Sequence, residues 1–134
     1  MDLRCAIDIA VMAHQGVMDK SGDPYILHPV AVMNSVDGVD AQVVAILHDV
    51  VEDTEITLDD LWALTPVQRA ALDAITRRDY EVYWDYILRV NENPLAAYVK
   101  NADLLHNMSP SRMAGCNKSM MDRYKKSLAF LRGE

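Results

Sequence analysis

The residues best suited to chemistry form one short run, His48-Asp49-Val50-Val51-Glu52-Asp53, which ends the most apolar stretch of the chain. Residues four apart share a helix face, so we expect His48 to lie over Glu52 and Asp49 over Asp53. His48 and Asp49 are about 100° apart around a helix, which lets a long and a short side chain converge on one point. Burying such groups unpaired costs several kcal/mol each, and a divalent cation held by His and Asp offsets that cost. The run predicts a metal site, although a single His-Asp pair at a helix end is more often simply solvated.

The stretch 94–108 has a similar organisation. Its apolar residues recur at helical spacing, and Lys100, Asp103 and Asn107 fall at i, i+3 and i+7 on another face. Asp103 is therefore a further candidate metal ligand, and Lys100 and Asn107 are candidate substrate-facing groups. His106 lies off the stripe that these three residues form, and we interpret it as a structural histidine.

A third polar segment, Lys20-Ser21-Gly22-Asp23-Pro24-Tyr25, precedes the pair His28-Pro29. A loop with a lysine, a flexible Ser-Gly and an aromatic residue can close over a nucleotide, with the lysine acting as a point charge on phosphate. The same residues fit an ordinary surface loop whose tyrosine fills a gap in the core. The segment taken alone leaves both interpretations open.

The elements that must position these residues are all helical. Apolar residues recur at helical spacing along the chain, glycine and proline fall between such stretches, and alternation typical of strands is missing. We predict an all-α fold, one domain over residues 1–134 with about seven to eight helices. The expected helices cover 3–16, 28–37, 40–51, 57–64, a helix opened by Thr65-Pro66, 79–91, 94–108 and 117–132.

The composition narrows the classes of function. The 134 residues are 51% hydrophobic and 25% charged, as in a globular protein, and they contain no apolar run long enough to span a membrane. The start lacks the layout of a secretory signal, and two isolated cysteines make no disulfide framework, so we expect a cytoplasmic protein. A net charge of −7 disfavours nucleic-acid binding but is compatible with a small phosphorylated substrate. The oligomeric state stays open.

The order His…His-Asp…Asp resembles that of the HD phosphohydrolase superfamily. The strings AHQGVMDKSGDPYILHPVAV (13–32), AILHDVVEDTEITLDDL (45–61) and VKNADLLHNM (99–108) resemble the hydrolase domain of RelA/SpoT-type alarmone enzymes and the small alarmone hydrolases. The resemblance covers most of the first 108 residues in the same order. Beyond residue 108 it is loose, with Tyr124 as a counterpart of a substrate-contacting tyrosine.

The resemblance implies a chemistry and a role for each matching position. The implied reaction is manganese-dependent hydrolysis of guanosine tetra- or pentaphosphate, (p)ppGpp, to GDP or GTP and pyrophosphate. The implied metal ligands are His28, His48, Asp49 and Asp103. The acids implied to orient or activate the attacking water are Glu52 and Asp53. The resemblance implies substrate contacts for Lys20, Asn107 and Tyr124. The residue patterns described above add Tyr25 and Lys100 to the expected substrate contacts.

Two positions depart from the family pattern. The family commonly has an arginine, which packs on the guanine base, where this chain has Asp19. It also usually has an arginine directly after HNM, where this chain has Ser109-Pro110-Ser111 before Arg112. One alternative is therefore a different nucleotide with a 2′- or 3′-phosphate, such as NADPH, and another is a non-catalytic module that senses nucleotides or binds a partner. The chain is short for an added synthetase domain, so we expect hydrolase activity alone.

Overall fold

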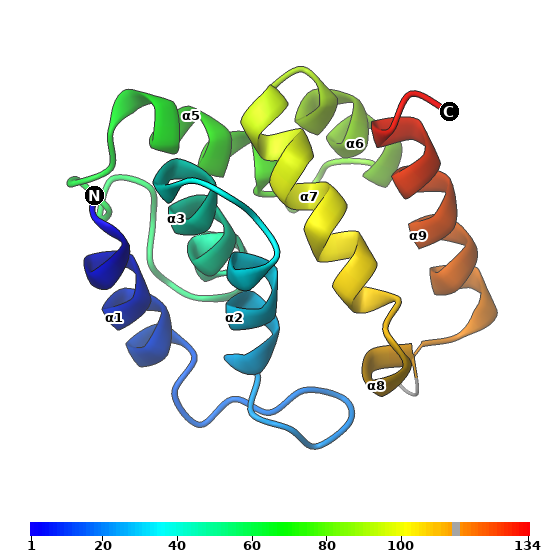
Figure 1. Ribbon diagram of the computed structural model, residues 1–134, viewed down its shortest axis with the longest axis horizontal. Coiled ribbons are helices and arrows are strands. Elements are labelled where there is room, and N and C mark those ends of the chain that lie inside the picture. Colours follow the sequence, from blue (N-terminus) through cyan, green and yellow to red (C-terminus); the bar gives the residue numbers. More distant parts are fainter. Residues whose placement is uncertain (114–115) are drawn as a thin grey trace.

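Two helices, α3 and α7, organise the packing in the computed structural model, which describes residues 1–113 and 116–134. Helix α3 packs against α1, α2, α5 and α7, and α7 in turn contacts α2, α5, α6 and α9 (Figure 1). The predicted all-α fold is confirmed: the described residues form nine helices and no strand, and two of the helices have only four residues. The bounds are α1 Leu3–Ala13, α2 Leu27–Asn34, α3 Val39–Leu47, α4 Val50–Asp53, α5 Pro66–Ile75, α6 Tyr83–Asn91, α7 Pro94–Asn107, α8 Pro110–Met113 and α9 Lys118–Leu131.

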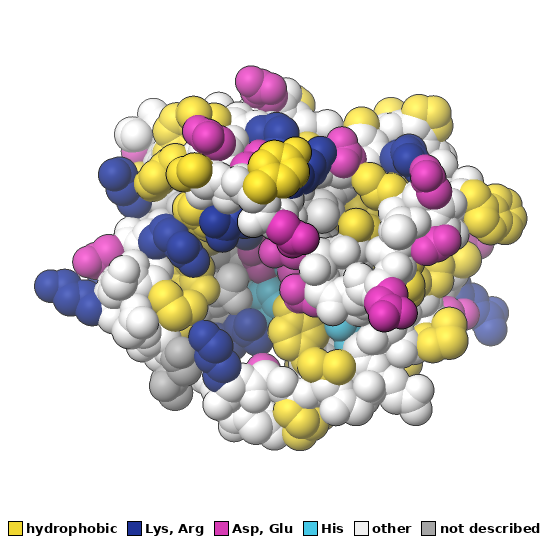
Figure 2. All heavy atoms as spheres, turned by 180° about the vertical axis from the view of Figure 1, so that it is seen from behind, with side chains coloured by type: hydrophobic (Ala, Val, Ile, Leu, Met, Phe, Trp, Pro, Cys, Tyr) yellow, Lys and Arg dark blue, Asp and Glu magenta, His cyan; other side chains and the backbone are white. Residues whose placement is uncertain are grey.

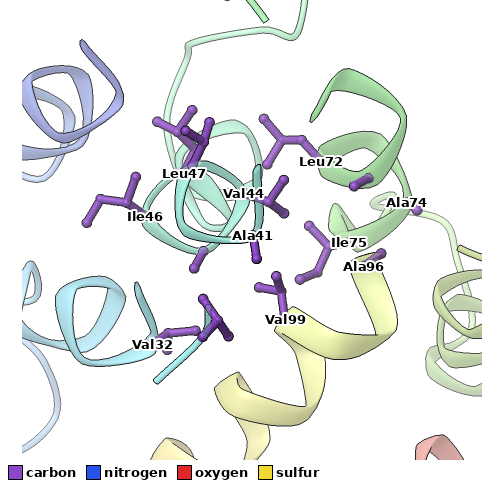
Figure 3. Close-up of a cluster of buried hydrophobic side chains, with 14 of the residues drawn as sticks. Val32, Ala41, Val44, Ile46, Leu47, Leu72, Ala74, Ile75, Ala96 and Val99 are labelled. Atoms are coloured by element: carbon purple, nitrogen blue, oxygen red, sulfur yellow. The ribbon is translucent and has the colours of Figure 1, made fainter. Parts of the chain in front are cut away.

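The core is centred on α3, whose residues from Val43 to Leu47 are fully buried. Figure 3 shows Ala41 and Val44 of α3 directed toward Ile75 of α5 and Val99 of α7. Each fully buried aliphatic side chain contributes about 1.5–3 kcal/mol relative to an exposed one. The apolar stretch thus forms a rigid base directly before His48, and α7 is packed against it.

Side-chain caps fix the starts of the later helices where the sequence predicted them. The Thr65 hydroxyl oxygen accepts a hydrogen bond from the backbone N–H of Gln68. The Gln68 side-chain oxygen accepts one from the backbone N–H of Thr65, which completes a capping box. Asn93 accepts from the Ala96 N–H ahead of α7, and Asn117 accepts from the Met120 N–H ahead of α9. These caps set the register of the helices that carry Asp103 and Tyr124.

Several elements differ from the expected ones. Helix α1 ends at Ala13 rather than at residue 16, and α2 covers Leu27–Asn34 rather than 28–37. Residues 57–64 form successive turns with hydrogen bonds three residues apart, because so short a stretch is marginal as a helix by itself. From these turns Leu61 is buried in the core, and Leu58 and Leu64 pack against it. Helix α6 begins at Tyr83 rather than at residue 79. The expected helix 40–51 bends at His48-Asp49, between the end of α3 and the start of α4. The short helix α8 was not expected. No helix in the described part of the chain is both long and apolar enough to cross a bilayer.

Candidate functional site

One cleft of about 900 Å³ contains every residue that the sequence assigns to chemistry. Its volume lies toward the upper end of the range for small-ligand sites, about 300–1,000 Å³. Figure 2 shows the hollow from behind the view of Figure 1, with histidine at its floor, basic side chains along one margin and acidic ones along the other. The predicted residues that line it are Lys20, Tyr25, His28, His48, Asp49, Glu52, Asp53, Lys100, Asp103, Asn107 and Tyr124.

Four of these side chains meet at the floor of the cleft. The Nε2 atoms of His28 and His48 lie 2.8 and 3.1 Å from Oδ1 of Asp103. His48 Nε2 also lies 3.1 Å from Oδ2 of Asp49. One ligand atom from each of His28, His48 and Asp49 lies within 4.8 Å of the others, close enough to surround one ion. Helix α2 supplies His28, the bend between α3 and α4 supplies the His-Asp pair, and α7 supplies Asp103.

The protonation of His48 indicates that this donor set fits a divalent cation. We assign the outer N–H of the ring to Nδ1, which donates to the Ala45 carbonyl oxygen at 2.6 Å. The neutral ring then presents a lone pair on Nε2 to two carboxylates, which is favourable only with a positive charge between them. Although burial opposes charge on the ring, the carboxylates of Asp49 and Asp103 raise the pKa of His48 well above its ordinary value. The proton that His48 takes up at Nε2 lies between the two carboxylates, where a metal ion would supply the same positive charge.

Lys100 of α7 is bonded to one of these two carboxylates, that of Asp103. Its Nζ donates to Oδ2 of Asp103 at 2.8 Å and lies 5.4 Å from the centroid of the Tyr86 ring. Despite burial, the Asp103 carboxylate raises the pKa of Lys100 well above its usual range. Despite the same burial, Lys100 and His48 hold the pKa of Asp103 well below its usual range. The lysine therefore stays charged. Asp103 is its one hydrogen-bond acceptor among the described residues, so two of its three N–H donors can serve a ligand in the cleft.

Tyr25 lies in the wall of the cleft, where its hydroxyl donates a hydrogen bond to Oδ2 of Asp49. Burial, followed by the charge of Asp49, raises the pKa of Tyr25 far above its ordinary value, so the hydroxyl stays protonated. The centroid of the Tyr25 ring lies 5.0 Å from the centroid of the His14 ring, and His14 is buried. The Nε2 atom of His14 has no hydrogen-bond partner among the described residues, and burial lowers the pKa of this histidine. The tyrosine thus orients Asp49, a role that the sequence did not suggest.

Glu52 and Asp53 belong to α4, and both line the cleft. The Asp53 N–H donates to the Asp49 carbonyl oxygen at 2.9 Å, so Asp53 follows Asp49 by one turn as predicted. Glu52 instead accepts a hydrogen bond from the backbone N–H of Arg77 at 3.1 Å. Burial in the cleft, and next the Asp49 carboxylate, raises the pKa of Asp53 to about 6, and burial raises the pKa of Glu52. A carboxylate with a pKa near 6 is suited to take up a proton at neutral pH.

His106 contacts the metal-binding group from its outer side. Its Nδ1 lies 2.7 Å from Nδ1 of His28, and the two rings stack with their centroids 4.9 Å apart. Because His28 presents Nε2 to Asp103, we assign its N–H to Nδ1, where His106 accepts it. Burial lowers the pKa of His106, which favours the neutral ring that can accept. From the sequence His106 was interpreted as structural, outside the site. Its position three residues after Asp103 was the signal that could have placed it there.

The remaining predicted residues line the cleft without touching the metal-binding atoms directly, apart from Asn107. Asn107 Nδ2 lies 3.5 Å from Asp103 Oδ1, a long hydrogen bond. Lys20 belongs to the loop between α1 and α2, and Tyr124 to α9. Three arginines also line the cleft. The sequence did not indicate them as site residues, because no regular spacing links them to the histidines and acids. They are Arg77, Arg112 and Arg123.

No family model matches the chain, but curated proteins do. A 121-residue alignment is 35% identical to the GTP pyrophosphokinase of Streptomyces coelicolor and covers 80% of this chain and 14% of that protein. The guanosine-3′,5′-bis(diphosphate) 3′-pyrophosphohydrolase of Haemophilus influenzae is 33% identical, with 75% of this chain and 17% of that protein covered. The bifunctional (p)ppGpp synthase/hydrolase SpoT of Escherichia coli is 34% identical, with 79% and 17% covered. The chain therefore spans about a sixth of the length of these relatives or less.

A solved structure has the same fold. It is described as a metazoan ortholog of SpoT that hydrolyses ppGpp, and it matches with a TM-score of 0.76. The match covers 98% of this chain and 85% of that chain at 22% sequence identity. The helical arrangement is thus a known one, and the site residues must be argued from this chain itself.

Proposed function

Since the chain is an HD-type domain similar to the hydrolase domain of RelA/SpoT proteins, we propose that it hydrolyses (p)ppGpp with the help of manganese. The products are GDP or GTP and pyrophosphate, released by cleavage of the bond between the ribose 3′ oxygen and phosphorus. The name of the Haemophilus relative supports this reaction, whereas that of the Streptomyces relative refers to a kinase. Each name describes a protein of which this chain matches a small part.

The observation that carries the proposal is the convergence of two imidazole nitrogens and two carboxylates at the floor of the cleft. In this proposal His28, His48, Asp49 and Asp103 hold the metal ion, and His106 and Tyr25 orient His28 and Asp49. A divalent ion bound there would polarise the phosphate and lower the pKa of a water molecule. The two carboxylates are ligands that suit manganese, and imidazole nitrogens are ligands that also suit iron, nickel and zinc.

Asp53 is the group that we assign to the proton. Its carboxylate follows Asp49 by one turn, and its pKa of about 6 leaves it mostly ionised at pH 7. It can accept a proton from the water as the oxygen–phosphorus bond forms. The leaving 3′ oxygen takes a proton from solvent in the open cleft. Glu52, held by the Arg77 N–H, is assigned to orienting the water.

The phosphate that is cleaved has cationic partners on α7. Lys100 keeps its charge beside Asp103 and has N–H donors left for phosphate oxygens. Asn107 lies two turns beyond Lys100 on the same helix and is assigned to the sugar. We assign Lys20 to a phosphate, and Tyr124, which lines the cleft from α9, to a further contact with the nucleotide. These contacts orient the nucleotide so that its 3′ phosphate lies over the metal ligands.

The test is a comparison of substrates with the purified protein in manganese. We expect release of pyrophosphate from ppGpp, and little phosphate release from NADPH or guanosine 3′-monophosphate. Asp53→Asn keeps the shape of the side chain and should lower kcat by about 100-fold or more with little change in KM. Turnover of NADPH in place of ppGpp would retain the metal site and refute the proposed substrate. Tight binding of these nucleotides without turnover of any of the three would refute the proposal that the protein is an enzyme.

A further inference from the structure

Two segments that lie far apart in the sequence meet at the mouth of the cleft. The first loop, residues 17–24, and helix α8 are joined by a hydrogen bond from Ser21 Oγ to the Ser111 carbonyl oxygen at 2.9 Å. They are joined again by a contact of 3.7 Å between Nη1 of Arg112 and Oδ2 of Asp19. Asp19 and Arg112 both line the cleft. This mouth lies beyond the metal ligands, and the reaction as derived above uses only Lys20 from it.

Asp19 is a structural part of the first loop. Its Oδ1 accepts the backbone N–H groups of Ser21 and Asp23, each at 2.9 Å, and its own N–H donates to the Asp23 carbonyl oxygen at 2.8 Å. These bonds make the tight turn that carries Lys20 into the cleft lining. An arginine at position 19 has no acceptor atoms and cannot make the two bonds to the backbone. The remaining oxygen of Asp19 is the one that faces Arg112.

Arg112 is held at one edge and has donors left at the other. Its Nε donates to Oδ1 of Asn107 at 3.0 Å, and Asn107 in turn contacts Asp103. A guanidinium group has five N–H donors, and within the described residues this is its one hydrogen bond. The 3.7 Å contact with Asp19 is an ion pair too long for a hydrogen bond. The Nη groups are therefore available to a ligand, and two intervening contacts fix their position relative to Asp103.

We propose that Arg112 binds the phosphate group of the nucleotide that is not cleaved, the one on the 5′ side. This inference rests on the proposed function. Among the residues of these two segments that line the cleft, Lys20 and Arg112 carry positive charges and Asp19 carries a negative one, in a chain whose net charge is −7. The loop's other carboxylate, Asp23, is exposed and lies outside that lining. The planar fork of arginine matches phosphate oxygens in a bidentate contact. Asp19 and Asn107 act as positioning residues for that fork.

Binding to nucleotides that lack one phosphate group tests this without turnover. We would titrate GDP, ADP and guanosine 3′-monophosphate by calorimetry in manganese, using wild type, Arg112→Gln and Arg112→Lys. Arg112→Gln should weaken GDP and ADP alike by about 10- to 100-fold, as expected for a charge-assisted hydrogen bond, and should leave guanosine 3′-monophosphate within about twofold. Arg112→Lys keeps the charge without the fork and should lie between. Arg4→Gln removes the same charge from an exposed position on α1 and should change nothing.

Each other outcome overturns the inference. Equal losses of affinity for all three ligands would mean that Arg112 supports either the fold or the overall electrostatic field of the cleft. An unchanged thermal unfolding temperature would then indicate the electrostatic field, and a lowered one the fold. A loss for GDP without a loss for ADP would place Arg112 on the base. Unchanged GDP binding in Arg112→Gln, or no GDP binding by wild type, would remove the contact altogether. Hydrolysis of ppGpp, assayed on the same samples, tests the proposed function separately.

Discussion

Replacing His106 by alanine should weaken manganese binding even though His106 is not a proposed ligand. The ring accepts the N–H of His28 at Nδ1, and it thereby keeps His28 Nε2 turned toward Asp103 and His48. Without His106 the Nδ1 proton of His28 loses its acceptor, and the ring is free to reorient. Partners of this kind behind a metal ligand typically change metal affinity by 10–100-fold.

The magnitude follows from the burial of the two rings. His28 is 2% exposed, so its outer N–H cannot easily find water. Leaving a buried donor unpaired costs about 1–3 kcal/mol, which corresponds to about 5- to 150-fold in affinity. His106 is only half-buried and borders a second groove of about 290 Å³, through which water can replace part of the lost contact. We therefore expect a loss of about 5- to 20-fold in manganese affinity.

The assay is a manganese titration followed by calorimetry, with the free ion measured by electron paramagnetic resonance. His106→Asn is the matched variant, because the asparagine Oδ1 can stand near the position of the histidine Nδ1 and accept the same N–H. It should restore most of the affinity that His106→Ala loses. Wild-type affinity in His106→Ala, or equal losses in both variants, would refute the positioning role.

Three further predictions concern the stability of the protein and its first loop. In EDTA, Asp53→Asn should raise the urea midpoint at pH 7.5 and not at pH 4. Its folded-state pKa of about 6 exceeds the ordinary 3.8, so the cost of ionisation is present above pH 6 and is lost as pH falls. Solvent in the cleft limits this gain to about 1 kcal/mol, and an equal gain at both pH values would contradict it. Asp19→Arg should lower the melting temperature and should not tighten GDP binding, because it breaks two loop hydrogen bonds and faces Arg112 with a like charge; tighter GDP binding in the titration would count against this account. Leu72→Ala should lower the free energy of unfolding by about 2–5 kcal/mol in urea, since Leu72 is fully buried in the core, and a loss below 1 kcal/mol would argue against that core.

The sequence predicted the helices best where local chemistry decides them. The capping box at Thr65 and the cap at Asn93 act within a few residues, so pattern and structure agree there. The bend at His48-Asp49 and the turns over residues 57–64 depend on packing against distant helices, which periodicity does not contain. The spacing that placed Asp53 over Asp49 survived the bend, whereas Glu52 is held by Arg77 from beyond α5.

The candidate site could be predicted as a set of residues but not as a network. Spacing on two helices was enough to select Asp49 and Asp103. The contacts of Asp103 with His28 and His48 arise only from the packing of α7 on α2 and α3. The roles of Tyr25 and His106 as orienting groups needed coordinates, because each contacts a residue more than 20 positions away. In the sequence, Arg112 was noted only because it follows HNM after three intervening residues, where the family usually has an arginine directly. The structure relates it to Asp19 at the mouth of the cleft.

The most direct test of the central claim is pyrophosphate release from ppGpp as a function of added manganese, starting from EDTA-treated protein. We expect release of GDP and pyrophosphate in equal amounts, with a rate that saturates as one site fills. Asp49→Asn preserves the shape of one proposed ligand and should abolish this response while the protein remains folded. Release that is independent of manganese, or an undiminished response in folded Asp49→Asn, would contradict the metal-dependent site.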